Sequence, residues 1–449
     1  MLRSTSRLFR ATARNSTRPR TVSHDHYPDF YRQGITQESS QKLSELLQEN
    51  HDKHHIFFNA NGFHNHIAHQ LLTIWALKAS PKDLQRGYNT NKGYQRPTAK
   101  PSPHTIQSLH DPETFKAHLG PQEHYNDFLQ FFSEAIDKKG WQDVLNEYVF
   151  SGSPLADDML VRMYAGFLHP IIHLGFGVEF QQPAIIAEAL AQAAVHDTWI
   201  GDLLLPAEKM SKQNGNDKTI VQLLDEIRAS REIREAPKWE DGNKIRDGLL
   251  KRCPQPLLDI VSQVRVNPDA LEQKTAEMTN AAIYYTGGAQ RANKVPKFDF
   301  YFMHCVNCSV FFPTFLKQPW LSQANKLRLL EWKIRLDLAM YASRKSPEIR
   351  IQDIRSYTPK KASGWDGIFD RVVQFDDDGH ASKLIRAIAN GEKICTPYEG
   401  KEGFVLGGGD WLQLGHMVID SVERPGENWV RSAGFDEAWE DVAERSAKL

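Results

Sequence analysis

The amino-acid sequence predicts a mainly helical protein, and three observations support this prediction. Apolar residues recur mostly at spacings of three and four residues rather than in alternation, which is typical of one face of an α-helix. Proline and glycine punctuate the chain between these stretches, as in 97–104 and 407–409. Internal repeats and low-complexity tracts are absent. A chain of 449 residues can bury a substantial core, so we expect one large helical domain, or two closely packed helical subdomains, over residues 27–445.

The individual helices are predicted from the segments in which this periodicity holds. In chain order these segments are 37–49, 64–79, 123–149, 157–180, 183–197, 218–232, 256–264, 270–283, 299–316, 322–342 and 380–390. Two stretches lack periodicity. Residues 87–121 are rich in Pro, Asn, Lys and His and are predicted to form a surface excursion or a lid, and residues 355–378 are predicted to be irregular. Few strands are expected.

The overall charge excludes some classes of partner. The 55 basic and 56 acidic residues are spread without long blocks of one sign, which argues against binding to nucleic acid or to an anionic membrane surface. The four cysteines are too few and too scattered to staple a chain of this length, so a reducing compartment is favoured. No stretch approaches the roughly 18 uninterrupted apolar residues that a membrane span needs, so we expect a soluble protein with a small neutral ligand.

The N-terminal segment 1–22 differs from the rest of the chain. It contains six arginines and several Ser and Thr residues, and the first acidic residue of the chain is Asp25. This composition is typical of a transit peptide, and a disordered basic tail is the alternative. The expected location is therefore the cytoplasm or the mitochondrion.

Histidine is the most informative residue type, because several of the 18 histidines lie in or beside apolar helical segments. A buried neutral imidazole needs a hydrogen-bond partner or a metal ion. In the first cluster, Asn61 is predicted to cap a helix on which His64 shares the apolar face. His66 and His69 would then project toward the other side. If that helix is buried all round, any of the three could face inward.

The second cluster contains the strongest predicted metal pair. His169 and His173 are four residues apart, a spacing that places both rings on one face of a helix and lets them bind one ion. Pro170 would start or kink the helix just after His169. The alternative is that both are core histidines bonded to carbonyl groups.

Two further histidines are candidates for the same site. His304 lies on an apolar stripe with Phe300, Cys308 and Phe311, so it is predicted to face inward as a ligand. Cys305 and Cys308 form a C-x-x-C pair within this stretch, but no second cysteine pair completes a zinc site, so core packing is the more natural role.

His196 ends the segment 183–197 and would return close to His169 if the flanking helices are antiparallel neighbours. It could then act as a ligand, as a support for a ligand or as a proton carrier. His380 and Lys383 lie three residues apart on one face of another predicted helix, after the acidic capping run 376–378. Taken alone, that segment indicates an ordinary amphipathic helix with a solvated lysine.

The sequence lacks the common signatures of nucleotide cofactors and of serine hydrolases. No G-x-G-x-x-G motif follows a strand and opens a helix, so a Rossmann-type site for flavin or nicotinamide has no support. No G-x-S-x-G elbow or phosphate-binding loop is present. Redox chemistry would therefore depend on a metal or on a cofactor bound without a recognisable fingerprint.

Five motifs together resemble the questin oxidase-like family of fungi, and their spread covers nearly everything after about Tyr27. The motifs are His64-Asn65-His66-Ile67-Ala68-His69, Trp75-Ala76-Leu77 with Gly87-Tyr88, His169-Pro170-Ile171-Ile172-His173-Leu174-Gly175, the segment 300–304 and Asp378-Gly379-His380-Ala381-Ser382-Lys383. The resemblance implies oxidative tailoring of anthraquinones and related polyketides, including Baeyer-Villiger-type oxygen insertion and ring opening. Some members of the family are NADPH-dependent, and others resemble non-haem iron dioxygenases.

In the iron-dependent members, the resemblance implies one Fe(II) held by four histidines and a carboxylated lysine. Lys383 matches the lysine, which replaces the interpretation of a solvated side chain. A carbamate gives lysine a carboxylate-like oxygen and removes its positive charge, so it suits a place beside a cation. The resemblance assigns the histidine ligands in the order His169 and His173, then His64, then His304. His196 and His66 are the alternative candidates for ligands, and they are also predicted to be the catalytic groups that move protons.

Two departures from the family pattern bear on the substrate pocket. After His304 the family tends toward Thr-Ser, where this chain has Asn307-Cys308, and Gln70 stands where a further histidine is common. We therefore expect an oxygenase that binds a planar phenolic substrate against Phe300, Phe302 and Phe311, with O₂ and, in a monooxygenase, NADPH. The alternatives are a metal-dependent hydrolase with a His and carboxylated-Lys site, and a non-catalytic helical binding protein.

Overall fold

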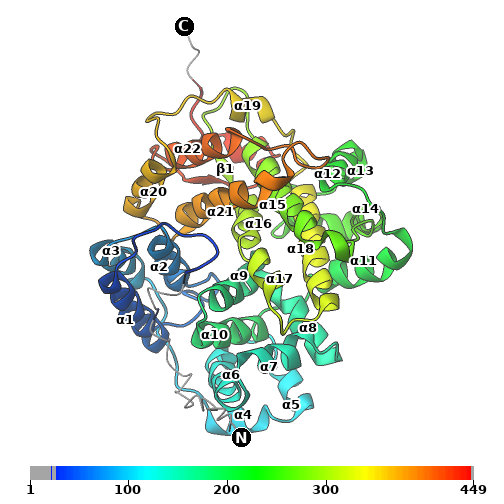
Figure 1. The fold of residues 1–449 in the computed structure, drawn as a ribbon. Helices are drawn as coiled ribbons and strands as arrows, with labels where there is room; N and C mark the ends of the chain where they lie inside the picture. Colours follow the sequence, from blue (N-terminus) through cyan, green and yellow to red (C-terminus); the bar gives the residue numbers. More distant parts are fainter. Residues whose placement is uncertain (1–21, 23–26, 446–449) are drawn as a thin grey trace, which may run out of the picture.

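The computed structural model describes Val22 and residues 27–445. Its secondary structure confirms the predicted mainly helical fold. The described residues contain 22 α-helices and two short strands (Figure 1). The predicted basic extension 1–22 lies outside the described residues except for Val22, whose side chain is buried. None of the helices in the described ranges is both long and apolar enough to span a bilayer.

Three helices near the N-terminus form one side of the molecule. They are α1 (Gln37–Lys53), α2 (Ile67–Ala76) and α3 (Pro81–Lys92), which pack against one another (Figure 1, blue). At the start of α3, the Ser80 hydroxyl oxygen accepts a hydrogen bond from the backbone N–H of Asp83, and the Asp83 carboxylate accepts one from the backbone N–H of Ser80. This capping box means that the local sequence determines where α3 begins. Helix α2 is buried at every position, so its neighbours rather than solvent surround it.

The centre of the molecule is built from two consecutive helices. Helix α9 (Ala165–Glu179) packs along α10 (Pro183–Ala194), and α10 packs in turn against α6 (Tyr125–Lys139). On its other side α9 contacts α16 (Phe300–Ser309) and α2. Helix α9 therefore contacts both parts of the chain, and α2 also packs directly on α21 (His380–Cys395) of the C-terminal part.

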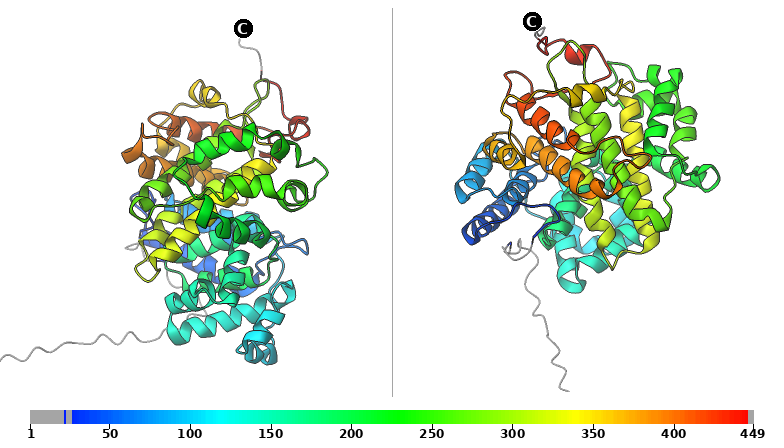
Figure 2. Two further views of the ribbon diagram at one scale, coloured as in Figure 1. Left: turned by 90° about the vertical axis from the view of Figure 1, so that its right-hand side faces the viewer. Right: turned by 45° about the horizontal axis from the view of Figure 1, so that its top comes forward.

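The C-terminal half adds long buried helices. Helix α15 (Leu271–Gly288) and α21 (His380–Cys395) pack on each other and on α16, while α22 (Asp410–Val422) packs on α21. The strand β1 (Phe298–Asp299) leads directly into α16 and pairs in parallel with β2 (Trp429–Val430). In the right-hand view of Figure 2 the orange helix of this half lies beside the blue N-terminal helices, in agreement with the contact between α2 and α21.

The remaining helices cover this centre. They are α4 (Pro103–Ser108), α5 (Pro112–Ala117), α7 (Trp141–Leu145), α8 (Pro154–Met163), α11 (Gly201–Asn214), α12 (Ile220–Ala229), α13 (Arg231–Glu235), α14 (Pro254–Val261), α17 (Phe312–Lys317), α18 (Gln323–Ser343), α19 (Ile351–Arg355) and α20 (Trp365–Gln374).

Some sequence predictions about the fold were wrong. The stretch 87–121 is not irregular throughout, because α4 and α5 each begin with a proline at the first helical position, where the missing N–H costs nothing. The stretch 355–378 contains α20. Asn61 does not cap a helix, because α2 begins only at Ile67 and Gly62 adopts a φ of 77° in a turn before it. His64 and His66 therefore precede the helix instead of sharing its faces.

Candidate metal centre

Four histidines from four different segments meet in the interior. His66 lies just before α2, His169 lies in α9, His304 in α16 and His380 is the first residue of α21, and each is at most 6% exposed. The Nε2 atoms of His66 and His169 are 2.8 Å apart, and those of His304 and His380 are 3.3 Å apart. Ligand atoms of His66, His169 and His380 all lie within 4.8 Å of one another. The rings of His169 and His304 complete the group, with centroids 4.8 Å apart.

In each of the four rings, the hydrogen bond made by Nδ1 determines the protonation state of Nε2. The Nδ1–H of His169 donates to the carbonyl oxygen of Gly166 (2.5 Å), and the Nδ1–H of His304 donates to that of Phe300 (2.6 Å). The Nδ1–H groups of His66 and His380 donate to the two oxygens of the Asp378 carboxylate, at 3.0 and 2.5 Å. Carbonyl and carboxylate oxygens can only accept, so each Nδ1 carries the proton and each Nε2 carries a lone pair.

The lone pairs of His66, His169 and His380 lie together, and that of His304 lies 3.3 Å from His380 Nε2, so a cation is the kind of partner that would satisfy them. Burial lowers the pKa of His66 to about 3 and holds the pKa of His169 and His304 well below the usual value, so the rings are neutral at pH 7. Burial also lowers the pKa of His380. Ligand histidines in metalloproteins hold their second N–H in this way, on a carbonyl or carboxylate oxygen. The donor set therefore fits a metal ion.

Lys383 belongs to the same buried region. It lies on α21 one turn after His380 and is 5% exposed, so the sequence interpretation of a solvated lysine is wrong. Burial lowers its pKa to about 8, although the nearby Asp378 and Asp377 carboxylates act in the opposite direction. The positive charge of Lys383 in turn lowers the pKa of His66. The lysine is thus electrostatically coupled to the histidine cluster and is neutral more often than a surface lysine.

A left-handed turn in α9 places His169. Gly166, Phe167 and Leu168 have φ values of 53°, 55° and 70°, a conformation that costs roughly 1–2 kcal/mol for each residue with a side chain. The turn directs the Gly166 carbonyl to His169, so the strain lies where the ligand is oriented. The distortion begins at Gly166, four residues before Pro170, where a proline removes the helical hydrogen bond and its ring clashes with the carbonyl group, so it agrees with the kink predicted at Pro170. Such strain is typical of functional sites.

Replacing Gly166 with alanine is expected to destabilise the protein by about 2–4 kcal/mol. A Cβ atom there would meet the His196 ring at 2.6 Å and the His64 ring at 3.2 Å, at a positive φ. Gly93→Ala is the matched control, because nothing lies within 4 Å of its Cβ position and its φ is −69°. Urea denaturation of both variants measures the difference, and equal stabilities would contradict the role given to the turn.

A second histidine pair borders the cluster. The Nε2 atoms of His64 and His196 are 2.9 Å apart, and the His64 ring stacks on that of His169 with centroids 3.8 Å apart. Burial, with a smaller contribution from Arg162, lowers the pKa of His196 to about 4. The predicted proximity of His196 to His169 is thus present. His64 is near the cluster, but its Nε2 is directed to His196.

His173 faces away from the cluster in spite of its spacing from His169. Its Nε2–H donates to Glu188 (2.8 Å), and its Nδ1 lies 2.9 Å from His69 Nε2. The other oxygen of Glu188 accepts from His51 at 2.5 Å. The two rings thus have different partners: His169 Nε2 lies 2.8 Å from His66 Nε2, whereas His173 contacts Glu188 and His69. The predicted role of His173 as a metal ligand is untested, and the ligand set proposed below does not include it.

Glu188→Ala is expected to lower the stability at pH 7 by about 3 kcal/mol, because two buried imidazole N–H groups lose their acceptor. Burial opposes ionisation, but hydrogen bonds from His173 and His51 lower the pKa of Glu188 to about 2. Since the unfolded pKa is near 4.5, the stabilisation is complete above that pH and is lost as the pH falls toward 2. Urea titrations at pH 7 and pH 3 measure this, with the exposed Glu134→Ala as control. A pH-independent difference would contradict it.

A cavity of about 760 Å³ opens beside the cluster, and His66, His169 and His380 are among its walls. Several of its walls are aromatic side chains, namely Phe57, Phe58, Phe63, Phe167, Trp199, Phe300 and Tyr301. His64 and His196 also line it. Of the three phenylalanines predicted to hold a substrate, Phe300 lines the cavity. Phe302 instead packs on Tyr285 and Phe311 packs on Phe176, so those two predictions were wrong.

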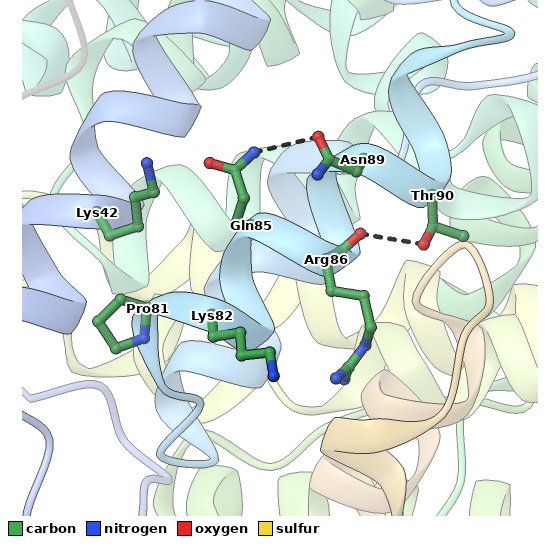
Figure 3. A pocket seen from close by; sticks show the side chains of 7 residues that line it. All are labelled: Lys42, Pro81, Lys82, Gln85, Arg86, Asn89 and Thr90. Atoms are coloured by element: carbon green, nitrogen blue, oxygen red, sulfur yellow. Dashed lines mark hydrogen bonds between the residues drawn. The ribbon is translucent and has the colours of Figure 1, made fainter.

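The surface hollow between α1 and α3 does not resemble a catalytic site. Its walls carry Lys42, Pro81, Lys82, Gln85, Arg86, Asn89 and Thr90 (Figure 3). Arg86 is already paired with Asp83 and Asp376, and the Gln85 and Asn89 side chains bond to each other. The walls hold no histidine, cysteine or carboxylate. The cavity at the histidine cluster is therefore the candidate site.

Comparison with known proteins identifies the family. The model for questin oxidase-like proteins matches residues 63–388. The chain belongs to this family. It is 41% identical to the Baeyer-Villiger oxidase ptaJ of Pestalotiopsis fici, over 90% of this chain and 93% of the relative. It is 39% identical to the questin oxidase of Aspergillus terreus, over 88% of this chain and 91% of the relative.

The family membership also decides the class of protein. A further relative, the oxidoreductase AflY of Aspergillus parasiticus, is 41% identical over 90% of this chain and 83% of its own length. The chain is therefore an enzyme, an oxidoreductase, which confirms that part of the sequence prediction. The hydrolase and the non-catalytic binding protein are not retained.

Sequence reasoning missed one cluster member and its support. His380 was interpreted as part of an ordinary helix, and Asp378 as part of a capping run, which is the role that Asp377 has toward Gly379 and Ala381. The signal was the Asp378-Gly379-His380 triplet. Gly379 has a φ of 88°, and a Cβ there would meet Gln70 at 2.7 Å, so only glycine lets the chain turn closely enough to present both side chains.

Proposed function

We propose that this oxidoreductase is an oxygenase that inserts oxygen into an aromatic, anthraquinone-type polyketide at a non-haem iron. The observation that carries the proposal is the set of four neutral histidines whose Nε2 lone pairs converge while each Nδ1–H is held by an oxygen. The aromatic cavity beside them supports a planar substrate. The names of the relatives, which include Baeyer-Villiger oxidases and a questin oxidase, support the same reaction class.

His66, His169, His304, His380 and carboxylated Lys383 would hold the iron. This set differs from the one transferred from the family resemblance, in which His64 and His173 stood in place of His66 and His380. Iron(II) in this position would supply the redox centre that activates O₂. Two further buried groups, His69 Nδ1 and the Asn307 side-chain amide, have no hydrogen-bond partner within residues 27–445, which is compatible with an additional polar group in this region.

Carboxylation of Lys383 requires its neutral amine. The nitrogen lone pair forms a bond with the carbon of CO₂, one N–H proton is released to water, and a carbamate anion remains. With a pKa of about 8, a tenth or so of Lys383 is neutral at pH 7, far more than of a lysine with the usual value of 10.5. The product places a negative oxygen ligand where a positive charge stood beside the neutral histidines, which favours a cation.

The chain's own residues would bind the substrate and move its proton. The aromatic walls exclude water and hold a planar ring system. His196 lines the cavity and is neutral at pH 7, so its ring would be the acceptor of a phenolic proton, with His64 as the partner that shares it; its pKa of about 4 makes it a weaker base than an ordinary histidine. Arg431 and Arg246 also line the cavity and can face an anionic oxygen of the substrate.

The experiment for this proposal is oxygen uptake by the iron-loaded protein with anthraquinone substrates such as questin, in ¹⁸O₂, with and without NADPH. A dioxygenase places both oxygen atoms in the product and needs no reductant, whereas a monooxygenase places one and takes two electrons and two protons to form water. Labelled product in either case supports the proposal and decides the role of NADPH. Product without ¹⁸O, or no oxygen uptake across such substrates, would overturn it.

A further inference from the structure

A second cavity shares a wall residue with the reaction cavity and is lined by both residues of β2. It has a volume of about 690 Å³ and is bordered by residues 424–427, 429–431, 437–438 and 441–443, together with Trp239, Val295 and Lys297. Arg431 lines both cavities. The ring of Trp429, another wall, lies 6.5 Å from the ring of His380. The two cavities thus share Arg431 as a wall, and Trp429 links the second cavity to a histidine of the cluster.

The inner end of this second cavity carries a buried cation. Lys297 is 4% exposed and precedes β1, and its Nζ donates to the carbonyl oxygen of Ser421 at 2.9 Å. Burial, and then the positive charges of Arg424 and Lys360, lower its pKa to about 8, and these charges act more strongly than the negative charge of Glu427. A buried ammonium group costs free energy unless an anion approaches it. The inner end therefore favours a negatively charged group.

The walls and the rim narrow the class of ligand. Trp239 is 42% exposed and its ring lies 5.7 Å from that of Phe435, so it offers an aromatic face that is held in place. The rim carries Glu427, Glu437 and Asp441, which are exposed. Solvent screens these carboxylates from a single charge near Lys297, but a polyphosphate long enough to reach the rim would meet them. The cavity therefore suits an aromatic monoanion better than a nucleotide.

We propose that this second cavity is a binding site for an aromatic carboxylic acid, with Lys297 as the counter-ion of the carboxylate and with Trp239 and Trp429 beside the ring. Arg431 would contact the bound acid from the side of the reaction cavity. Its guanidinium lies over the Phe300 ring at 4.7 Å, and Phe300 packs against His304. An occupant is therefore one side chain away from the wall of the reaction site.

The test is isothermal titration of the full chain with 1-naphthoate, and with 1-naphthalenemethanol as its neutral counterpart. We expect naphthoate to bind more tightly than the alcohol. Lys297→Met, which keeps the length of the side chain and removes the charge, is expected to weaken naphthoate at least about tenfold and to leave the alcohol unchanged. Lys82→Met, at the hollow of Figure 3, is the matched control and is expected to change neither affinity.

A second variant covers the case in which Lys297→Met does not fold. Trp239→Ala changes an exposed side chain, so the fold is expected to persist, and both probes are expected to bind severalfold more weakly. Equal affinities for the two probes, or naphthoate binding unchanged in both variants, would overturn the proposal, as would tighter binding of inorganic pyrophosphate than of naphthoate. Iron-free and iron-loaded protein are expected to bind naphthoate alike, so this result is independent of the oxygenase proposal.

Discussion

Replacing Asp378 with asparagine is expected to lower the affinity for iron by about 10²–10⁴-fold and to abolish turnover at ordinary iron concentrations. One carboxylate holds the Nδ1–H groups of both His66 and His380. Loss of one such support typically costs about 10–100-fold in metal affinity, and here two ligands lose theirs together. An amide has a single acceptor oxygen, so it cannot hold both rings in the required tautomer.

Competition with a colorimetric chelator measures this affinity, and Asp376→Asn is the matched control. Asp376 lies two residues earlier, is exposed and pairs with Arg86 rather than with a histidine. We expect the control to bind iron like the wild type. An Asp378→Asn variant with wild-type affinity would mean that the orientation of His66 and His380 does not depend on this carboxylate.

The second large effect is expected at Lys383. Lys383→Ala removes the carbamate oxygen. The iron content is therefore expected to fall to a small fraction of the wild-type value, and the rate of oxygen uptake is expected to fall at least about 10²-fold. Acetate or propionate at millimolar concentration is expected to restore part of both, because a small carboxylate can enter the space left by the side chain and supply the missing oxygen. Lys393→Ala, on the same helix but bonded to the Asp29 carbonyl at the surface, is the control.

Rescue separates a ligand role from a structural one. If Lys383 only fills space, Lys383→Met retains iron and carboxylates have no effect. In the wild type, iron binding is expected to strengthen with bicarbonate and as the pH rises from 7 to 8.5, because the neutral amine that reacts with CO₂ becomes more abundant toward its pKa of about 8. Iron binding that is independent of bicarbonate would contradict the carbamate.

The sequence predicted the fold class and part of the site, for reasons that can be named. Helical periodicity is local, so α1, α10 and α18 could be predicted from it. The inward direction of His304 followed from the apolar stripe of its helix. The cysteines of the C-x-x-C pair are buried and free, which agrees with the predicted core role.

The rest of the site depends on contacts that local patterns do not encode. The choice between His64 and His66 required the start of α2, and a false N-cap at Asn61 moved it too early. The hydrogen bond from His66 to Asp378 joins residues 312 positions apart. His169 faces His66, which precedes α2, and His173 bonds to Glu188 of α10, so the different directions of the two rings depend on other segments and could not be predicted from their spacing.

The most direct test of the account is the metal content of anaerobically purified protein, measured by elemental mass spectrometry for the wild type and three histidine variants. We predict about one iron per chain in the wild type, lost in His66→Ala and in His380→Ala but retained in His173→Ala, whose ring faces Glu188. Circular dichroism checks that each variant is folded. Iron retained by folded His66→Ala and His380→Ala, or a wild type that binds no iron, would contradict the account.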